Sequence, residues 1–298
     1  MKAPYRITEK EDVYKNAKVK FMPDGFCRVT AFNRGVYKGE FYEPIIMRSF
    51  EIDKAEVLSA EREYLESLNS DRVSDSERVR NDSFKRAKDK IFEIASANDW
   101  SYMVTLTLDR DKIDRYDKDV VKNTVGKWLD NMVQRKDLKA LIVPEHHKDG
   151  AIHFHGLVND SLTFTPSGNY KIKGQKGTVK LSTLRKKGKN ITDSDVQEVF
   201  NIKEYKLGFS TAVKLDGNVT AVSYYMTKYC TKDLEKIFGS YYIAVGKIKR
   251  QLPYQICNID FEQIRQAPNS KIVDLPERLG QVAYITITKD DFEGLEIL

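Results

Sequence analysis

Cysteine is scarce in this sequence, and long hydrophobic runs are missing. The three cysteines, Cys27, Cys230 and Cys257, are far apart and odd in number. They fit neither a disulfide framework nor a zinc ribbon, and they favour a reducing compartment. No apolar run approaches the roughly 20 residues that a membrane span needs, and the N-terminal stretch lacks the apolar core of a signal peptide. We therefore expect a cytoplasmic protein that makes no contact with a membrane.

Histidine is also rare, but its four copies fall in one place. His146, His147, His153 and His155 lie in the segment ALIVPEHHKDGAIHFHGLV, residues 140–158. An apolar run, a Lys-Asp-Gly turn and a second strand with two-residue alternation are typical of a β-hairpin. Alternation puts His153 and His155 on one face of the second strand. These imidazoles are a candidate metal site, or else the polar residues of an ordinary surface hairpin.

The length of the hairpin loop decides whether Glu145 can join the two histidines. A two-residue Asp-Gly loop would pair Glu145 with Phe154 and turn its carboxylate away. A three-residue loop with Gly150 in the left-handed conformation would pair Glu145 with His153 on the same face. We predict the three-residue loop, which makes Glu145 the third candidate ligand. In this register His147 shares the face of Glu145 and His146 points away.

Acidic residues are missing from a long segment, Ser161 to Ile191, although the net charge of the whole chain is only +6. Glycines are interleaved with its cations, so we expect a mobile loop or ribbon. Such a segment suits phosphate backbones, and the alternative is a solvated insertion with no partner. Its basic residues are Lys171, Lys173, Lys176, Lys180, Arg185, Lys186, Lys187 and Lys189.

The remaining patterns predict a mixture of strands and helices. The order strand, helix, strand, strand around the histidine hairpin favours an α+β sheet with helices packed on one face. Residues 1–50 read as strand-rich. Strands are also expected at 101–108, 208–215 and 282–288, and helices at 53–68, 83–97, 118–135, 196–200 and 220–234.

The predicted helix at 220–234 contains the sequence YMTKY. Tyr225 and Tyr229 are four residues apart and share a helix face. A tyrosine is a poor nucleophile at neutral pH because its pKa is near 10. A lysine ammonium such as that of Lys228 favours the phenolate. Alternatively, the tyrosines only pack on a core while the lysines face solvent.

Three segments together resemble the HUH endonucleases, which include the rolling-circle replication initiators of phages and plasmids. VTLTL at 104–108 is similar to their first motif, and HFH at 153–155 to their His-hydrophobic-His motif. YMTKY at 225–229 resembles the two-tyrosine motif of initiators from small single-stranded DNA phages. The resemblance covers about residues 80–250. It divides the chain into an N-terminal extension (1–75), an endonuclease domain (76–250, with the basic insertion 161–191) and a C-terminal extension (251–298).

The resemblance implies a fold and a reaction. The fold is a central antiparallel sheet, related to the RNA-recognition fold, with HFH on a central strand. A metal held by His153, His155 and Glu145 would polarise the scissile phosphate, and the imidazoles favour Mn²⁺ over Mg²⁺. Tyr225 would attack and leave a 5′-phosphotyrosine, Tyr229 would carry out a second transfer, and Lys228 would assist.

Partners and rival functions also follow from the resemblance. The substrate would be single-stranded DNA at a replication origin, in the cytoplasm of a bacterial host. No GxxxxGK[ST] motif is present, so a host helicase would open the duplex, and a host polymerase would extend the free 3′-hydroxyl. The rivals are a transposase or relaxase with the same chemistry, a non-catalytic DNA-binding protein, and a metal-dependent hydrolase that uses water.

Overall fold

The chain forms two compact units. A computed structural model of the 298 residues describes residues 14–22, 25–38, 75–175, 177–215, 217, 219–229, 236–275 and 280–294. One unit comprises residues 50–251, and the other comprises residues 1–49 together with 252–298. No helix in the described ranges is long and apolar enough to cross a membrane. The predicted helix at 53–68 lies outside the described residues.

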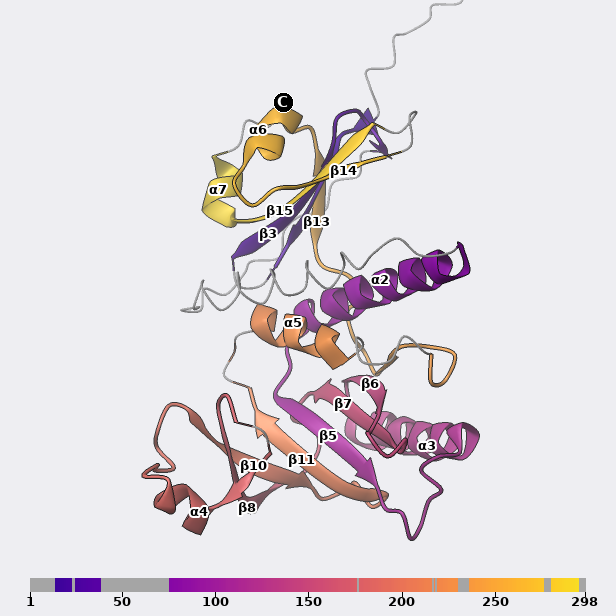
Figure 1. Ribbon diagram of the computed structural model, residues 1–298, viewed down its shortest axis with the longest axis vertical. Coiled ribbons are helices and arrows are strands. Elements are labelled where there is room, and N and C mark those ends of the chain that lie inside the picture. Colours follow the sequence, from indigo (N-terminus) through magenta and orange to yellow (C-terminus); the bar gives the residue numbers. More distant parts are fainter. Residues whose placement is uncertain are drawn as a thin grey trace, which may run out of the picture. The chain divides into compact units, whose positions relative to one another are not determined.

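An eight-stranded sheet is the framework of the 50–251 unit (Figure 1). Its order is β12-β6-β7-β5-β11-β10-β8-β9, and each neighbouring pair is antiparallel. The α+β class with a central antiparallel sheet is therefore confirmed. The strands are β5 (Tyr102–Leu108), β6 (Ala140–His146), β7 (Ile152–Val158), β8 (Phe164–Ile172), β9 (Val179–Lys180), β10 (Val196–Ile202), β11 (Gly208–Lys214) and β12 (Ile243–Val245).

Helices cover both faces of this sheet, whereas the sequence predicts them on one. Helix α3 (Lys118–Lys136) shares a buried cluster with Ile142 and Phe154. Helices α2 (Asp75–Ser96) and α5 (Val219–Tyr229) contribute to a second cluster with Leu141 and Leu157. Neighbouring strand residues point to opposite faces, so the two clusters lie on opposite sides. The cause is that β6 is apolar on both faces and needs cover on each.

Two segments differ from their predicted structure. Residues 196–200 belong to strand β10, not to a short helix, because β10 pairs with β8 on one side and β11 on the other. Five residues are also too few for a stable helix, whereas β-branched and aromatic residues suit a strand. The basic insertion adds β8, β9 and the short helix α4 (Leu181–Lys186) to the sheet edge. It is an ordered ribbon in its described part.

The other unit joins both ends of the chain in one five-stranded sheet, a connection that the sequence did not reveal. Its order is β13-β2-β3-β15-β14, and its core includes Val29, Ile259, Ala283 and Phe292. The predicted strand at 282–288 is confirmed as β15. The elements are β2 (Ala17–Phe21), β3 (Phe26–Phe32), β13 (Tyr254–Cys257), α6 (Phe261–Gln266), β14 (Lys271–Asp274), β15 (Gln281–Thr288) and α7 (Lys289–Glu293), with the separate pair β1 (Tyr14–Lys15) and β4 (Tyr37–Lys38).

Candidate active site

The β6–β7 hairpin closes through the predicted three-residue loop. The backbone N–H of His147 donates to the carbonyl of Ala151 at 2.8 Å, and the N–H of Gly150 donates to the carbonyl of His147 at 2.8 Å. Gly150 has φ +85°, in the region that glycine adopts without the penalty of a Cβ atom. Lys148, Asp149 and Gly150 therefore form the loop, with Gly150 in the predicted left-handed conformation.

This loop sets the register that brings Glu145 to the histidines. Glu145 pairs with His153, as predicted, and Val143 pairs with His155. The carboxylate of Glu145 reaches along the same face, and its Oε2 lies 3.2 Å from Nε2 of His155. Glu145 is only 8% exposed. A carboxylate at this depth requires a polar or cationic partner, and the imidazole of His155 is one such partner.

Two threonines on β5 hold the histidine rings from the other side. Thr105 pairs with His155 and Thr107 with His153. Each Oγ1 contacts the Nδ1 of the facing ring, at 3.2 Å for Thr105–His155 and 3.3 Å for Thr107–His153. Such contacts fix the ring orientation, as partners behind metal-bound histidines do. The sequence did not assign these threonines a role, although alternation on β5 places them opposite its buried apolar residues.

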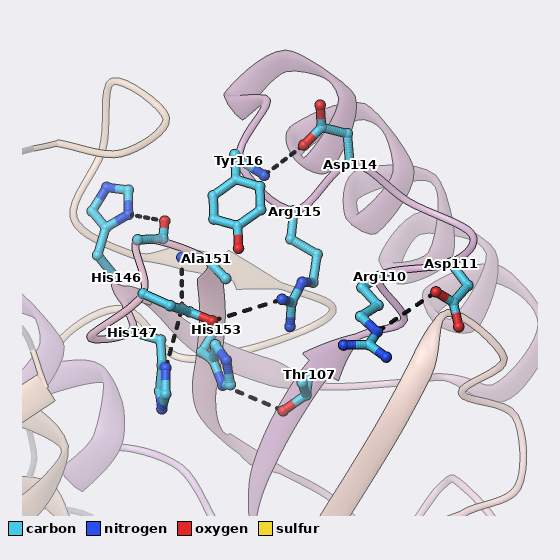
Figure 2. Close-up of polar contacts among 12 residues, drawn as sticks. Thr107, Arg110, Asp111, Asp114, Arg115, Tyr116, His146, His147, Ala151 and His153 are labelled. Carbon is cyan, nitrogen blue, oxygen red and sulfur yellow. Dashed lines mark hydrogen bonds and ion pairs between the residues drawn. The ribbon is translucent and has the colours of Figure 1, made fainter.

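The ring of His153 lies in a cluster of polar groups at the end of the hairpin (Figure 2). The His147 ring stacks on it with centroids 4.7 Å apart, which confirms that His147 shares the face of Glu145. Nδ1 of His147 lies 3.1 Å from Oδ1 of Asp149, whose other oxygen is 3.7 Å from Arg115. His146 instead places its Nδ1 3.1 Å from the carbonyl of Gly150.

The electrostatics of this cluster favour a neutral His153. Burial lowers the pKa of His153 below its usual value, and the nearby His147, His155 and Arg115 lower it further, against the opposing effect of Asp149. The backbone N–H of Ala151 holds the pKa of Asp149 below its usual range, with smaller contributions from His147 and Arg115. The neutral imidazole has the free lone pair that metal binding and hydrogen-bond acceptance both require.

The donor set of His153, His155 and Glu145 suits a divalent metal chemically, because imidazole nitrogens and a carboxylate are ligands of Mn²⁺ and Mg²⁺. The side chains share one face and each ring is held through Nδ1. Within the described ranges, however, no three His, Cys, Asp or Glu side chains converge closely enough to hold an ion. A bound metal would therefore have to draw these three groups together.

Helix α5 lies over the sheet face that carries the histidines. Its Met226 belongs to the same buried cluster as Leu141, Val143 and Leu157. Strand alternation places Val143 and Leu157 on the face of His153 and His155. Tyr224 packs against Phe92 of α2 with ring centroids 4.6 Å apart. These contacts fix which face of the sheet α5 covers.

The two candidate tyrosines differ in how much of them is described. Tyr225 follows the buried Tyr224, so its side chain leaves the helix about 100° around the axis, and it is 37% exposed. Lys228 and Tyr229 lie in the last turn of α5, and their side chains are outside the described residues. The catalytic roles of Tyr225, Lys228 and Tyr229 remain predictions.

The basic candidates lie far from the histidines within the same sheet. Strand β9 is five strands away from β7, which corresponds to about 24 Å at the usual strand spacing. Lys187 donates from Nζ to Oε1 of Gln175 at 2.6 Å, and Lys176 lies outside the described residues. The exposed cations in this region are Lys173, Lys180, Arg185, Lys186 and Lys187, and Lys171 is half-buried.

Comparison with known proteins agrees with this location of the site. A family model of replication-associated proteins of the ORF2 type matches residues 101–234. The matched region begins just before β5, contains the histidine hairpin and the basic ribbon, and extends beyond α5. This part of the chain is similar to replication-associated proteins, which indicates a role in DNA replication. No curated protein and no solved structure matches the chain.

Proposed function

We propose that the protein nicks and rejoins single-stranded DNA to initiate and terminate rolling-circle replication of a phage or plasmid. The observation that carries this proposal is the coincidence of three features on one sheet face. His153 and His155 lie beside Glu145 on β6 and β7, helix α5 with Tyr225 covers the same face, and all are within the region similar to replication-associated proteins.

The proposed reaction is a transesterification. The phenolic oxygen of Tyr225 forms a bond to phosphorus while the bond from phosphorus to the 3′ oxygen breaks. The phenolic proton passes through solvent to the 3′ oxygen, which leaves as a hydroxyl. The phosphotyrosine conserves the energy of the phosphodiester, so no external nucleotide is consumed. Tyr229 carries out the second transfer that ends the round, and Lys228 stabilises the phenolate form of the nucleophile.

His153, His155 and Glu145 are the proposed ligands of Mg²⁺ or Mn²⁺. The ion would supply Lewis-acid polarisation of the scissile phosphate. Thr105 and Thr107 keep the imidazoles oriented through their Nδ1 contacts. Single-stranded origin DNA is the proposed substrate, with contacts to Lys171, Lys173, Lys176, Lys180, Arg185, Lys186 and Lys187. A host helicase and polymerase in a bacterial cytoplasm would complete the replication machinery.

The test is formation of a covalent adduct. The full-length protein is incubated with Mn²⁺ and single-stranded stem-loop DNA from its own replicon, and the products are separated under denaturing conditions. Wild type should form a 5′-linked adduct that Tyr225→Phe lacks. Tyr170→Phe, a substitution of the same kind on β8, should retain it. The absence of an adduct with every such substrate would refute the proposal, and an undiminished adduct in Tyr225→Phe would transfer the first role to Tyr229.

A non-catalytic single-stranded DNA-binding protein is the second candidate. It is favoured by the separation of the three candidate ligands, which do not converge among the described residues. Such a protein would shift the DNA in a native gel without cleaving it. A hydrolase that uses water would cleave the DNA without an adduct, and a transposase or relaxase would form the adduct on DNA from a different kind of element.

A further inference from the structure

The cross-strand register places a phenylalanine in the same row as the candidate ligands. Glu145 on β6 pairs with His153 on β7, His153 pairs with Thr107 on β5, and Thr107 pairs with Phe209 on β11. Directly paired residues point to the same face of a sheet. Phe209 is therefore on the histidine face, two strands from His153, which corresponds to about 10 Å.

Phe209 is the most exposed large hydrophobic side chain among the described residues, with 73% of its surface accessible. Further along the same face of β11, Val213 is only 8% exposed, whereas Thr211 is exposed like Phe209. Helix α5 lies near the C-terminal end of β11 and leaves its N-terminal end uncovered (Figure 1). Cover by helices therefore ends between Val213 and Thr211, and the open part of the face begins beside the histidines.

The backbone that carries Phe209 is held firmly on both sides. A Cβ at Gly208 would lie 2.2 Å from the carbonyl oxygen of Thr107, so only glycine permits this approach of β11 to β5. On the other side, the backbone N–H of Ile202 donates to Oγ of Ser210 at 2.8 Å. The exposed ring is thus presented by a fixed strand and not by a loose loop, which lowers the entropy lost when a flat ligand stacks on it.

Cations stand at the same edge of the sheet. The N–H of Asp109 donates to the carbonyl of Leu207, so Arg110 leaves β5 beside the start of β11. Arg110 and Arg115 line a pocket of about 380 Å³ formed by residues 110–116. Their side chains extend on the side of Thr107 and His153 (Figure 2). Each forms an ion pair, with Asp111 at 3.6 Å and Asp149 at 3.7 Å, and a guanidinium has further donors for a phosphate.

We infer that the open face beside His153 is a nucleotide-binding subsite for single-stranded DNA, with an unpaired base stacked on Phe209 and the neighbouring phosphate bound by Arg110. An aromatic ring on a sheet face is a platform for any base, because every base has a π-face. An arginine at the strand end supplies the charge for the backbone. The subsite holds DNA close to the proposed metal ligands and independently of the distant basic ribbon.

The inference rests on the proposed function for its choice of ligand, but its test requires no nicking. Binding is measured in EDTA with two labelled probes, an oligothymidylate and an abasic deoxyribose-phosphate strand of equal length. Phe209→Ser should weaken binding of the oligothymidylate roughly 5- to 150-fold, the range for loss of one base stack, and leave the abasic strand unaffected. Phe209→Trp should bind both probes as wild type does.

Two further variants separate base stacking from charge and from general surface effects. Arg110→Ser should weaken binding of both probes and reduce the slope of log affinity against log salt by about 0.7. Val120→Ser, at an exposed apolar residue on α3, should change neither affinity. Equal oligothymidylate affinity in wild type and Phe209→Ser would overturn the inference, and so would an equal loss for both probes.

The outcome is distinguishable from failure of the proposed function. If wild type forms no adduct but Phe209→Ser loses its preference for the strand with bases, the subsite stands in a protein that only binds DNA. If wild type forms the adduct and Phe209→Ser binds both probes normally, the nicking function stands and the subsite is refuted.

Discussion

The centre of the eight-stranded sheet and its basic edge use polar side chains in opposite ways. In β5, β6 and β7 the polar groups contact one another: Glu145 lies against His155, and Thr107 against His153. At the β8–β9–α4 edge the cations are exposed to solvent, as at Lys180 and Lys186. Chemistry on a bond requires groups fixed by packing, whereas attraction of a polyanion requires only charge and access. The difference predicts that substitutions at the centre will affect catalysis and those at the edge will affect binding.

The largest expected effect comes from His153→Ala. Loss of one proposed metal ligand should lower the rate of Mn²⁺-dependent nicking at least about a thousandfold, because the ion supplies several kcal/mol of charge stabilisation. Binding of single-stranded DNA in EDTA should be unchanged. His146→Ala removes a histidine from the same hairpin that points away from the site, and it should nick normally. A parallel loss of nicking and binding would mean that centre and edge do not act separately.

A smaller effect is expected for Thr107→Val, which removes the hydroxyl behind His153 and keeps the shape of the side chain. Loss of a partner behind a metal-bound histidine costs about 10- to 100-fold in metal affinity or activity. Mn²⁺ titration of nicking should show this shift. Thr211→Val, on the same face of β11, is the control. An unchanged Mn²⁺ requirement in Thr107→Val would exclude an orienting role for this hydroxyl.

Neutralising the edge should have the converse effect. Replacing Lys180, Arg185 and Lys186 by Gln should weaken DNA binding about tenfold or more at moderate salt and reduce the salt slope by up to about two, if each lysine or arginine contacts one phosphate. At saturating DNA the nicking rate should equal that of wild type. The charge-matched control replaces Lys122, Lys127 and Arg135, which are exposed on α3. If both triple variants lose the same affinity, net charge and not the ribbon attracts DNA.

The smallest change separates two glycines with the same backbone conformation. Gly150 has φ +85° in the histidine hairpin and Gly168 has φ +72° in β8. Alanine at either position should lower the free energy of unfolding by about 1–2 kcal/mol, because a Cβ is strained there, and denaturant titration measures this. Only Gly150→Ala should also reduce nicking, since its loop sets the pairing of Glu145 with His153. Equal nicking by both variants would show that the site tolerates a disturbed loop.

The sequence predicted local structure at the site better than its surroundings. Alternation and the Lys-Asp-Gly turn were sufficient to place Glu145 opposite His153, because hairpin register depends on a few adjacent residues. The roles of Thr105 and Phe209 could not be predicted in the same way. They depend on which strands lie next to β7 and β11, and this order is set by contacts between segments up to about a hundred residues apart. The structure of 196–200 was wrong for the same reason, since pairing on both edges decides it.

The five-stranded sheet of the other unit has a consequence for synthesis on the ribosome. Strands β2 and β3 pair with β13 and β15, more than two hundred residues further along the chain. A nascent chain therefore cannot complete this sheet until its last strand has been made, whereas residues 102–245 already contain the eight-stranded sheet. Because domains fold as units during synthesis, the candidate nuclease unit is expected to fold first, and the N-terminal strands are the last to find their partners.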